Sequence, residues 1–352
     1  MIRSELESRV KRGELVRGDA LAKDYSGARL NGGFFENIDF RGARFDAAVM
    51  DECTFINCRF DGVSAKKVHS VGASFVNCRL TEMDISHADL SKTNFVAPVL
   101  DGANLEHATL VSTNFVDASC RRTNFGTANL NLCSFVNTDA EGADFHDANL
   151  ERTNLIHVNL AGADLRNARM VQTILEKPEL ANTDFSGMDL SLSQFREANL
   201  ENCNFKGADI HQCGFMNANL KNANLQDANA FSAIFYGADL RGVHATGINL
   251  EQASLQKARL DGANFAFGRF VMAQLEEAKC RSAAFSGADV TYADFSHADL
   301  SEAEFSEAVM FRTNLHRALL ATAVFDGASR GDALGDDPVR AKAEDQAKSI
   351  KA

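Results

Sequence analysis

A five-residue period runs through most of this chain and constrains its fold more than any other feature. If every position divisible by five from Leu30 to Phe325 is a centre, fifty-three of the sixty centres carry Leu, Phe, Ile, Met or Val. Two residues before the centre, thirty-three of the sixty residues are Ala. Neither a helix of 3.6 residues per turn nor a strand of period two keeps this register over such a length. The period indicates a coil with short flat sides and regular corners, in which the centre and the residue two before it face inward.

A longer period of twenty residues lies over the shorter one. The segments CTFIN (53–57), ASFVN (73–77) and TNFVD (113–117) occupy equivalent places in their twenty-residue units. Four sides of five residues therefore close one coil, and neighbouring coils pair as parallel strands about 4.8 Å apart. Asp or Asn often precedes the centre and Gly often follows it by two, as expected at corners that need local hydrogen bonds or a positive φ. The sequence predicts about 15 coils.

The repeated units AGADL, EGADF, DGANL and HDANL follow the pattern A(D/N)LXX. In this pattern the chain resembles the pentapeptide-repeat family over residues 28–327. The resemblance implies an all-β fold, a right-handed quadrilateral parallel β-helix that forms a pentapeptide-repeat solenoid. Some members of the family are acidic DNA mimics that bind DNA gyrase or topoisomerase IV and protect it from inhibitors. The segment RGDALAKDYSGARL also resembles the start of pentapeptide-repeat proteins found with bacterial type VI secretion components.

Three segments are expected along the chain. Residues 1–14 form an N-terminal capping helix, because Ile2, Leu6 and Val10 share one helical face and Gly13 can end the helix. Residues 15–328 form the β-helix. Residues 329–352 are polar and are expected to be largely disordered.

Two local irregularities are expected within the β-helix. Ala65 and Ser70 are consecutive weak centres, so a bulge is expected within residues 61–72. Pro98 and Pro178 both lie two residues before a centre. Because proline cannot donate to a ladder of hydrogen bonds, the sequence predicts local loosening at both positions.

Charge and hydropathy argue against several classes of protein. A formal net charge of -12 disfavours direct binding of nucleic acid or of an anionic membrane. No apolar run is long enough for a signal peptide or a membrane span, so a cytoplasmic protein is expected. The eight cysteines form no CxxC pair, and we interpret them as reduced, buried small residues. Cys58 and Cys78 stack at a spacing that a disulfide can span, although buried packing is the simpler interpretation.

The sequence shows no catalytic or cofactor site. No nucleophile accompanies a plausible base, no GxxxxGK[ST] loop is present and a packed interior leaves no pocket, so an enzyme and a cofactor are not expected. His87 and His107 stack on adjacent coils, but a metal site would need a third ligand. Ordinary exposed histidines are the simpler interpretation, and no metal is expected.

Two surface features are candidate protein-binding sites. The first is a stripe of β-branched residues, one position after the centre on six consecutive coils, which either stiffens parallel strands or docks a partner. The second is an acidic run without Lys or Arg between Ser282 and Phe311, which either keeps the protein soluble or forms an acidic patch. The stripe contains Ile56, Val76, Val96, Val116, Val136 and Ile156, and the acidic run contains Asp289, Asp294, Asp299, Glu302, Glu304 and Glu307.

These observations predict a non-enzymatic scaffold for protein–protein interaction. A secretion component and a type II topoisomerase are the candidate partners, and a homodimer through one end of the solenoid is a further prediction. The alternative function is acidic DNA mimicry of the kind described above. The chain departs from those DNA mimics because it is longer, has no inserted loop and has no apolar C-terminal helix to join two copies.

Overall fold

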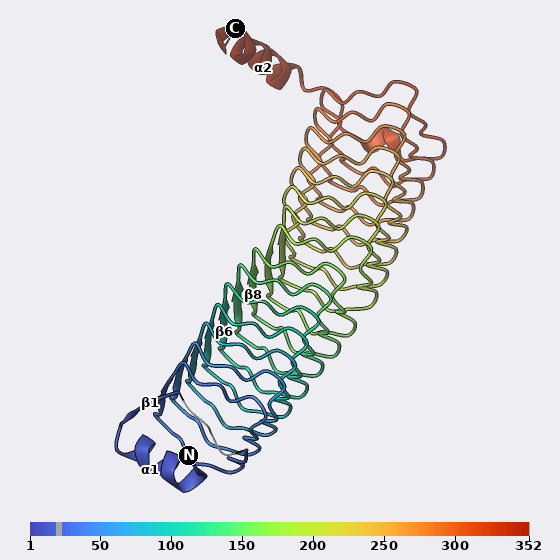
Figure 1. Cartoon of the computed structure of the whole chain (residues 1–352). Helices are drawn as coiled ribbons and strands as arrows, with labels where there is room; N and C mark the ends of the chain where they lie inside the picture. Colours follow the sequence, from blue (N-terminus) through green and yellow to red (C-terminus); the bar gives the residue numbers. More distant parts are fainter. Residues whose placement is uncertain (19–22, 352) are drawn as a thin grey trace. The chain divides into compact units, whose positions relative to one another are not determined.

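The computed structural model describes residues 1–18 and 23–351, and the chain divides into two compact units, Met1–Leu180 and Ala181–Ala352. Each unit is a stack of four-sided coils (Figure 1). The predicted fold class, a quadrilateral parallel β-helix with a short helix at its start, is confirmed. Within the described part of the chain, no helix combines the length and apolarity needed to cross a bilayer.

In the first unit, one wall of each coil is regular enough to form a three-residue strand. Neighbouring strands of this wall pair in parallel, and from β2 onward their partners are twenty residues apart, as in Phe35 with Phe55. The strands are β1 (Leu15–Arg17), β2 (Phe34–Glu36), β3 (Thr54–Ile56), β4 (Ser74–Val76), β5 (Asn94–Val96), β6 (Asn114–Val116), β7 (Ser134–Val136), β8 (Asn154–Ile156) and β9 (Ile174–Glu176).

Each five-residue side uses its backbone in the same way. The centre donates its N–H to the following coil, as Leu100 does to the Ser119 carbonyl at 2.7 Å. The residue before the centre donates to the preceding coil, as Val99 does to the Cys78 carbonyl at 2.9 Å. The corner residue two after the centre has a left-handed backbone, with φ +67° at Gly102. The period of five is therefore the repeat of this hydrogen-bonding scheme.

The core is a set of side-chain columns that run from coil to coil. Phe35, Phe55, Phe75, Phe95, Phe115 and Phe135 stack face to face with centroid distances between 4.5 and 5.1 Å. Small polar residues two before the centre are also satisfied: the Thr113 hydroxyl donates to the Leu90 carbonyl at 2.7 Å. All eight cysteines are free and buried, which confirms their interpretation as core residues.

The expected bulge at 61–72 is absent, and the ladder continues through Pro98. Ala65 and Ser70 are fully buried, and Ser64 and His69 keep their bridges to Asp84 and Asp89 of the next coil. The expected bulge is wrong because backbone pairing between coils does not depend on the size of the centre.

The position of Pro98 explains why it does no harm. A residue two before the centre donates its N–H within its own coil, as Ala103 does to the Leu100 carbonyl at 2.8 Å. Proline there removes a turn bond and no ladder bond. Ser119 still donates to the Pro98 carbonyl at 3.0 Å. Pro178 occupies the equivalent place in its own side.

Helix α1 (Arg3–Lys11) closes the start of the first unit. Leu6 and Val10 are buried, Ile2 precedes the helix and is 64% exposed, and Gly13 ends the turn with φ +69°. Arg3 donates to the carbonyls of Ser26 and Gly27 at 2.8 and 2.6 Å, so helix side chains satisfy backbone groups that have no preceding coil.

The second unit repeats the same coil with less regular strands. Strand β10 (Gln194–Arg196) is followed by single bridges at twenty-residue steps, beginning with Gln194 to Gly214. A 3-10 turn, η1 (Arg330–Asp332), leads to helix α2 (Pro338–Lys351).

Helix α2 differs from the disorder expected for residues 329–352. The Asp337 side chain accepts the N–H groups of Val339 and Arg340 at 2.9 and 3.1 Å, and Pro338 occupies the first helical position. Disorder was expected because the segment has few apolar residues. A capped helix start and polar contacts to the solenoid stabilise it instead.

Candidate functional site

The stripe forms a continuous column on the strand wall of the first unit. Ile56 pairs with Val76, Val76 with Val96, and the register continues to Ile156. Val96 is 37% exposed and the other five side chains are half-buried. The six side chains therefore present one uninterrupted line of branched apolar groups.

Bonded amides flank parts of the stripe on both sides. Along the strand, Asn114 donates its amide to the Asn94 side chain at 2.8 Å. At the corner, Asn57 donates to the Asn37 side chain at 3.1 Å. These bonds are local, because Ser74 and Ser134 occupy other strand positions and Ala97 interrupts the corner row, so fixed amides lie beside part of the stripe.

Carboxylates mark the two ends of the stripe. Glu36 pairs with Ile56 before the first stripe residue, and Glu176 pairs with Ile156 after the last one. The Glu36 carboxylate lies 2.7 Å from the Arg17 guanidinium. The apolar column thus has a defined length of six coils.

The acidic run does not gather on one face. Asp289, Asp294, Asp299 and Glu304 belong to four different ladders, in which their preceding partners are Arg269, Gln274, Lys279 and Ala284. Several of these carboxylates also bond to their own turns, as Asp294 does by accepting the Ser296 N–H at 2.8 Å. Glu302 and Glu307 occupy left-handed corners. The run therefore surrounds the coil, and the structure does not bring it together as a patch.

The two stacked pairs named from the sequence have structural roles. The His87 and His107 rings stack with centroids 4.8 Å apart, and the His107 Nδ1 is 2.6 Å from the Thr127 hydroxyl. Cys58 and Cys78 are buried thiols, and the hydrogen bond between them and burial together raise the pKa of Cys78. Neither pair is joined by a third ligand group among the described residues.

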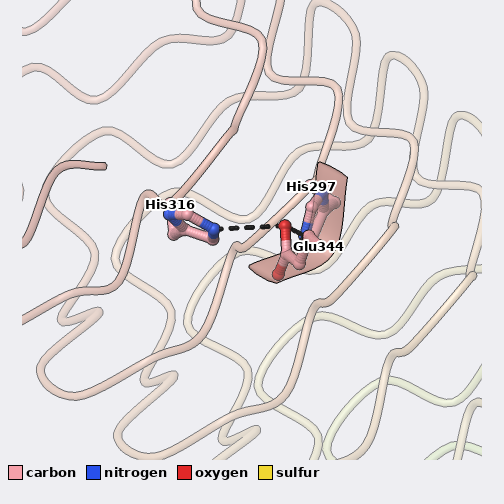
Figure 2. Close-up of side chains that lie close together, drawn as sticks. All are labelled: His297, His316 and Glu344. Atoms are coloured by element: carbon pink, nitrogen blue, oxygen red, sulfur yellow. Dashed lines mark hydrogen bonds and ion pairs between the residues drawn. The ribbon is translucent and has the colours of Figure 1, made fainter. Parts of the chain in front are cut away.

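A separate polar cluster joins α2 to the wall of its own unit (Figure 2). The Glu344 carboxylate lies 3.3 Å from Nε2 of His297 and 3.4 Å from Nε2 of His316. The guanidinium groups of Arg340 and Arg317 lie 2.9 and 3.5 Å from it. Burial raises the pKa of Glu344, but hydrogen bonds from His297, Arg340 and His316 outweigh burial and hold it at about 2. Glu344 is therefore ionised at neutral pH.

We call His297, His316 and Glu344 the Glu344 cluster. The sequence did not predict it. Its two histidines lie 28 and 47 residues before Glu344, and Glu344 falls in the segment expected to be disordered. The available signals were the Asp337–Pro338 helix start and the Arg340–Glu344 pair four residues apart.

Comparison with protein-family models decides the family. The model for the pentapeptide repeat region matches residues 68–145 and 190–265. The model for pentapeptide repeats in eight copies matches residues 26–62, 133–172 and 278–317. The chain belongs to the pentapeptide-repeat family. No curated protein matches it.

Solved structures of pentapeptide-repeat proteins are also similar to the chain. HetL, a protein involved in heterocyst differentiation regulation from Nostoc sp. strain PCC 7120, is 20% identical, with 83% of this chain and 91% of HetL covered and a TM-score of 0.35. QnrB1, a plasmid-mediated fluoroquinolone resistance protein, is 18% identical, with 59% of this chain and 92% of QnrB1 covered and a TM-score of 0.26. A thylakoid-lumen protein of Arabidopsis thaliana is 30% identical over 35% of this chain and 69% of its own, with a TM-score of 0.16.

Proposed function

We propose that this pentapeptide-repeat protein is a non-enzymatic scaffold that docks a protein partner along the stripe from Ile56 to Ile156. The observation that carries the proposal is the unbroken register of the six side chains on paired strands. A contiguous apolar row on a protein surface is typical of a contact surface. We further propose a cytoplasmic protein whose partner is a component of a bacterial secretion machine.

The surroundings of the stripe support docking over a merely stiffening role. A ladder that only stiffens strands needs β-branched residues, but it does not need bonded amides beside it. The Asn94–Asn114 and Asn37–Asn57 bonds immobilise the flanking amides. Their remaining donors and acceptors can bond a partner that covers the apolar row, at little further loss of side-chain entropy.

Replacing Val116 by Asp tests the docking surface. Val116 lies inside the stripe and pairs with Val96 and Val136, so a carboxylate there meets no cation in a covered apolar contact. Burying an unpaired charge costs several kcal/mol, so we expect partner affinity to fall by about a hundredfold or more. Binding is measured by capture from a bacterial lysate followed by mass spectrometry, and then by titration with the purified partner.

Val116→Thr is the matched control. It keeps the branched shape and the β propensity of the position without adding a charge. We expect the Thr variant to retain most of the captured partner, while both variants keep the wild-type circular dichroism spectrum and light-scattering mass. Equal capture by wild type and Val116→Asp would show that the stripe only stiffens the wall.

DNA mimicry is the alternative proposal, favoured by the net charge of -12. In that case gyrase or topoisomerase IV is the partner and exposed carboxylates carry the contact. The local pairing of acids disfavours it: Arg41 lies 2.5 Å from Asp39, Arg166 lies 2.5 Å from Asp164, and the acidic run surrounds its coil. Homodimerisation through an end of the solenoid stays a prediction, for which the half-buried Leu320 of the last coil offers apolar surface.

A further inference from the structure

We propose that the Glu344 cluster, His297, His316 and Glu344, binds one zinc ion and that this ion fixes α2 to the solenoid wall of its own unit. The inference is independent of the docking stripe, which lies in the other unit. Two imidazoles and one carboxylate are a ligand set that zinc accepts in proteins, with a fourth position left for water.

Two of the three distances between donor atoms already match those of a zinc site. The Glu344 carboxylate is 3.3 Å from the His297 Nε2 and 3.4 Å from the His316 Nε2, and all three ligand atoms lie within 4.8 Å of one another. Bonds of about 2.0–2.1 Å in a tetrahedron place neighbouring ligand atoms about 3.3 Å apart. Two edges match this value, and the third edge, between the histidines, is at most 4.8 Å and must shorten when zinc binds. Figure 2 shows both rings directed at the carboxylate.

Two coils of the solenoid and helix α2 supply the ligands. His297 sits at a left-handed corner with φ +59°, and its N–H donates to the His316 carbonyl at 2.9 Å. The coil ladder therefore holds the backbones of both histidines. His316 is 1% exposed, whereas His297 and Glu344 keep 30% and 24% of their side chains exposed. The site is thus anchored on one side and open to solvent on the other, so an ion can enter.

Zinc binding requires one defined proton movement. The Asp337 N–H donates to the His316 Nδ1 at 3.0 Å, so a neutral His316 carries its proton on Nε2, toward Glu344. A zinc ion needs the lone pair of Nε2, so this proton must move to Nδ1, and the Asp337 N–H bond to Nδ1 breaks. The Asp336 carboxylate lies 3.7 Å from Nδ1 and must approach to accept the new N–H; a carboxylate bonded to the outer nitrogen orients histidine ligands in metal sites. The proton moves from one ring nitrogen of His316 to the other, so a neutral His316 releases no proton.

The surrounding charges accommodate a dication. The cluster faces two cations, Arg317 and Arg340, and the carboxylates of Asp336, Asp345 and Glu344. Arg340 contacts Glu344 through Oε1 at 2.9 Å, which leaves Oε2, the atom near His316, for the metal. Arg317 retains its bonds to the Ala341 carbonyl and to Asp345 when it loses its longer contact with Glu344. Zinc therefore adds a bond between helix and wall and replaces two weaker contacts, the Arg317–Glu344 pair and the Asp337 N–H bond to His316.

The direct test is zinc titration of the full-length, reduced, tag-free chain in competition with a chromophoric chelator. We expect one zinc ion per chain. Glu344→Gln and His297→Ala should each weaken binding by about tenfold or more, because each removes one of three ligands. Glu302→Gln and His107→Ala are matched controls on surface residues, and zinc affinity should not change in them. Absence of zinc binding by the wild type, or equal binding by Glu344→Gln, would overturn the site.

Limited trypsin digestion tests the second half of the proposal. Helix α2 contains Arg340 and Lys342, its Val339 is 81% exposed, and its contacts with Arg317, His297 and His316 of the wall are polar. Saturating zinc should slow cleavage after Lys342 severalfold in the wild type and leave the rate unchanged in Glu344→Gln. In the wild type, nitrogen NMR shifts of His316 should report a proton on Nε2 without zinc and on Nδ1 with it. Equal cleavage rates with and without zinc would show that the ion does not fix α2.

Discussion

At the residue scale, the corner of each side explains most of the surface composition. An Asp or Asn before the centre accepts the N–H two residues on, as Asp39 does from Arg41 at 3.1 Å. Where that residue is Arg, its guanidinium also bonds the same carboxylate, as in the Asp39–Arg41 and Asp164–Arg166 pairs. Much of the acid is therefore structural, since it satisfies turn backbone that faces water.

Asp39 should titrate far below an ordinary aspartate. The hydrogen bond from the Arg41 side chain lowers the pKa of Asp39 from 3.8 to about 2. A lowered folded pKa stabilises the protein above the unfolded pKa, and this stabilisation is lost as pH falls from about 4 through about 2. The effect on stability is small, because 46% of the Asp39 side chain is exposed to screening solvent.

Carbon-detected NMR titration of the carboxyl groups measures this directly. Arg41→Gln should return the pKa of Asp39 toward its ordinary value while other aspartates, such as Asp184, keep theirs. A wild-type Asp39 that titrates near 3.8 would contradict the assigned pair.

At the element scale, α1 acts as a lid on the first coil. Leu6 is fully buried, whereas Ile2, four residues earlier, is 64% exposed. Leu6→Asp should release the lid at a cost of about 2–5 kcal/mol, as for other large-to-small core changes with an added buried charge. The exposed edge of β1 then favours aggregation. We expect a lower thermal unfolding midpoint and increased light scattering on heating.

Ile2→Asp is the control for this lid. It adds the same charge to the same segment at an exposed position, so its unfolding midpoint should match the wild type. If both variants behave alike, burial of Leu6 does not hold the lid.

The period predicted the elements well, and its errors have identifiable causes. Inward pairs, stacked phenylalanines and buried cysteines all follow from the phase of five. The expected loosening at Pro98 was wrong. The position within the five-residue unit decides which N–H groups bond to a neighbouring coil, and the N–H two before the centre bonds within its own coil. Helix α2 could not be read from the period, because its contacts join residues 28 to 47 positions apart.

At the scale of the whole molecule, the repeat allows the sequence to predict which residues share a surface column, but it does not allow the sequence to predict what that column binds. A solenoid places equivalent positions in columns, so the stripe could be named from the sequence and its register is confirmed. The acidic run was named only as a candidate patch, and Asp289, Asp294, Asp299 and Glu304, which are five residues apart, lie on successive sides. No repeat rule predicts a partner.

The most direct test of the docking account is a salt gradient applied to the protein with its partners captured from a native bacterial lysate. Contact through the apolar stripe predicts that the main partner stays bound at about 1 M salt, where the Debye length is about 3 Å and exposed charges are screened. The same partner should be lost from Val116→Asp at every salt concentration. Release at modest salt, with a gyrase or topoisomerase IV subunit as the eluted protein, would contradict the account and favour acidic mimicry.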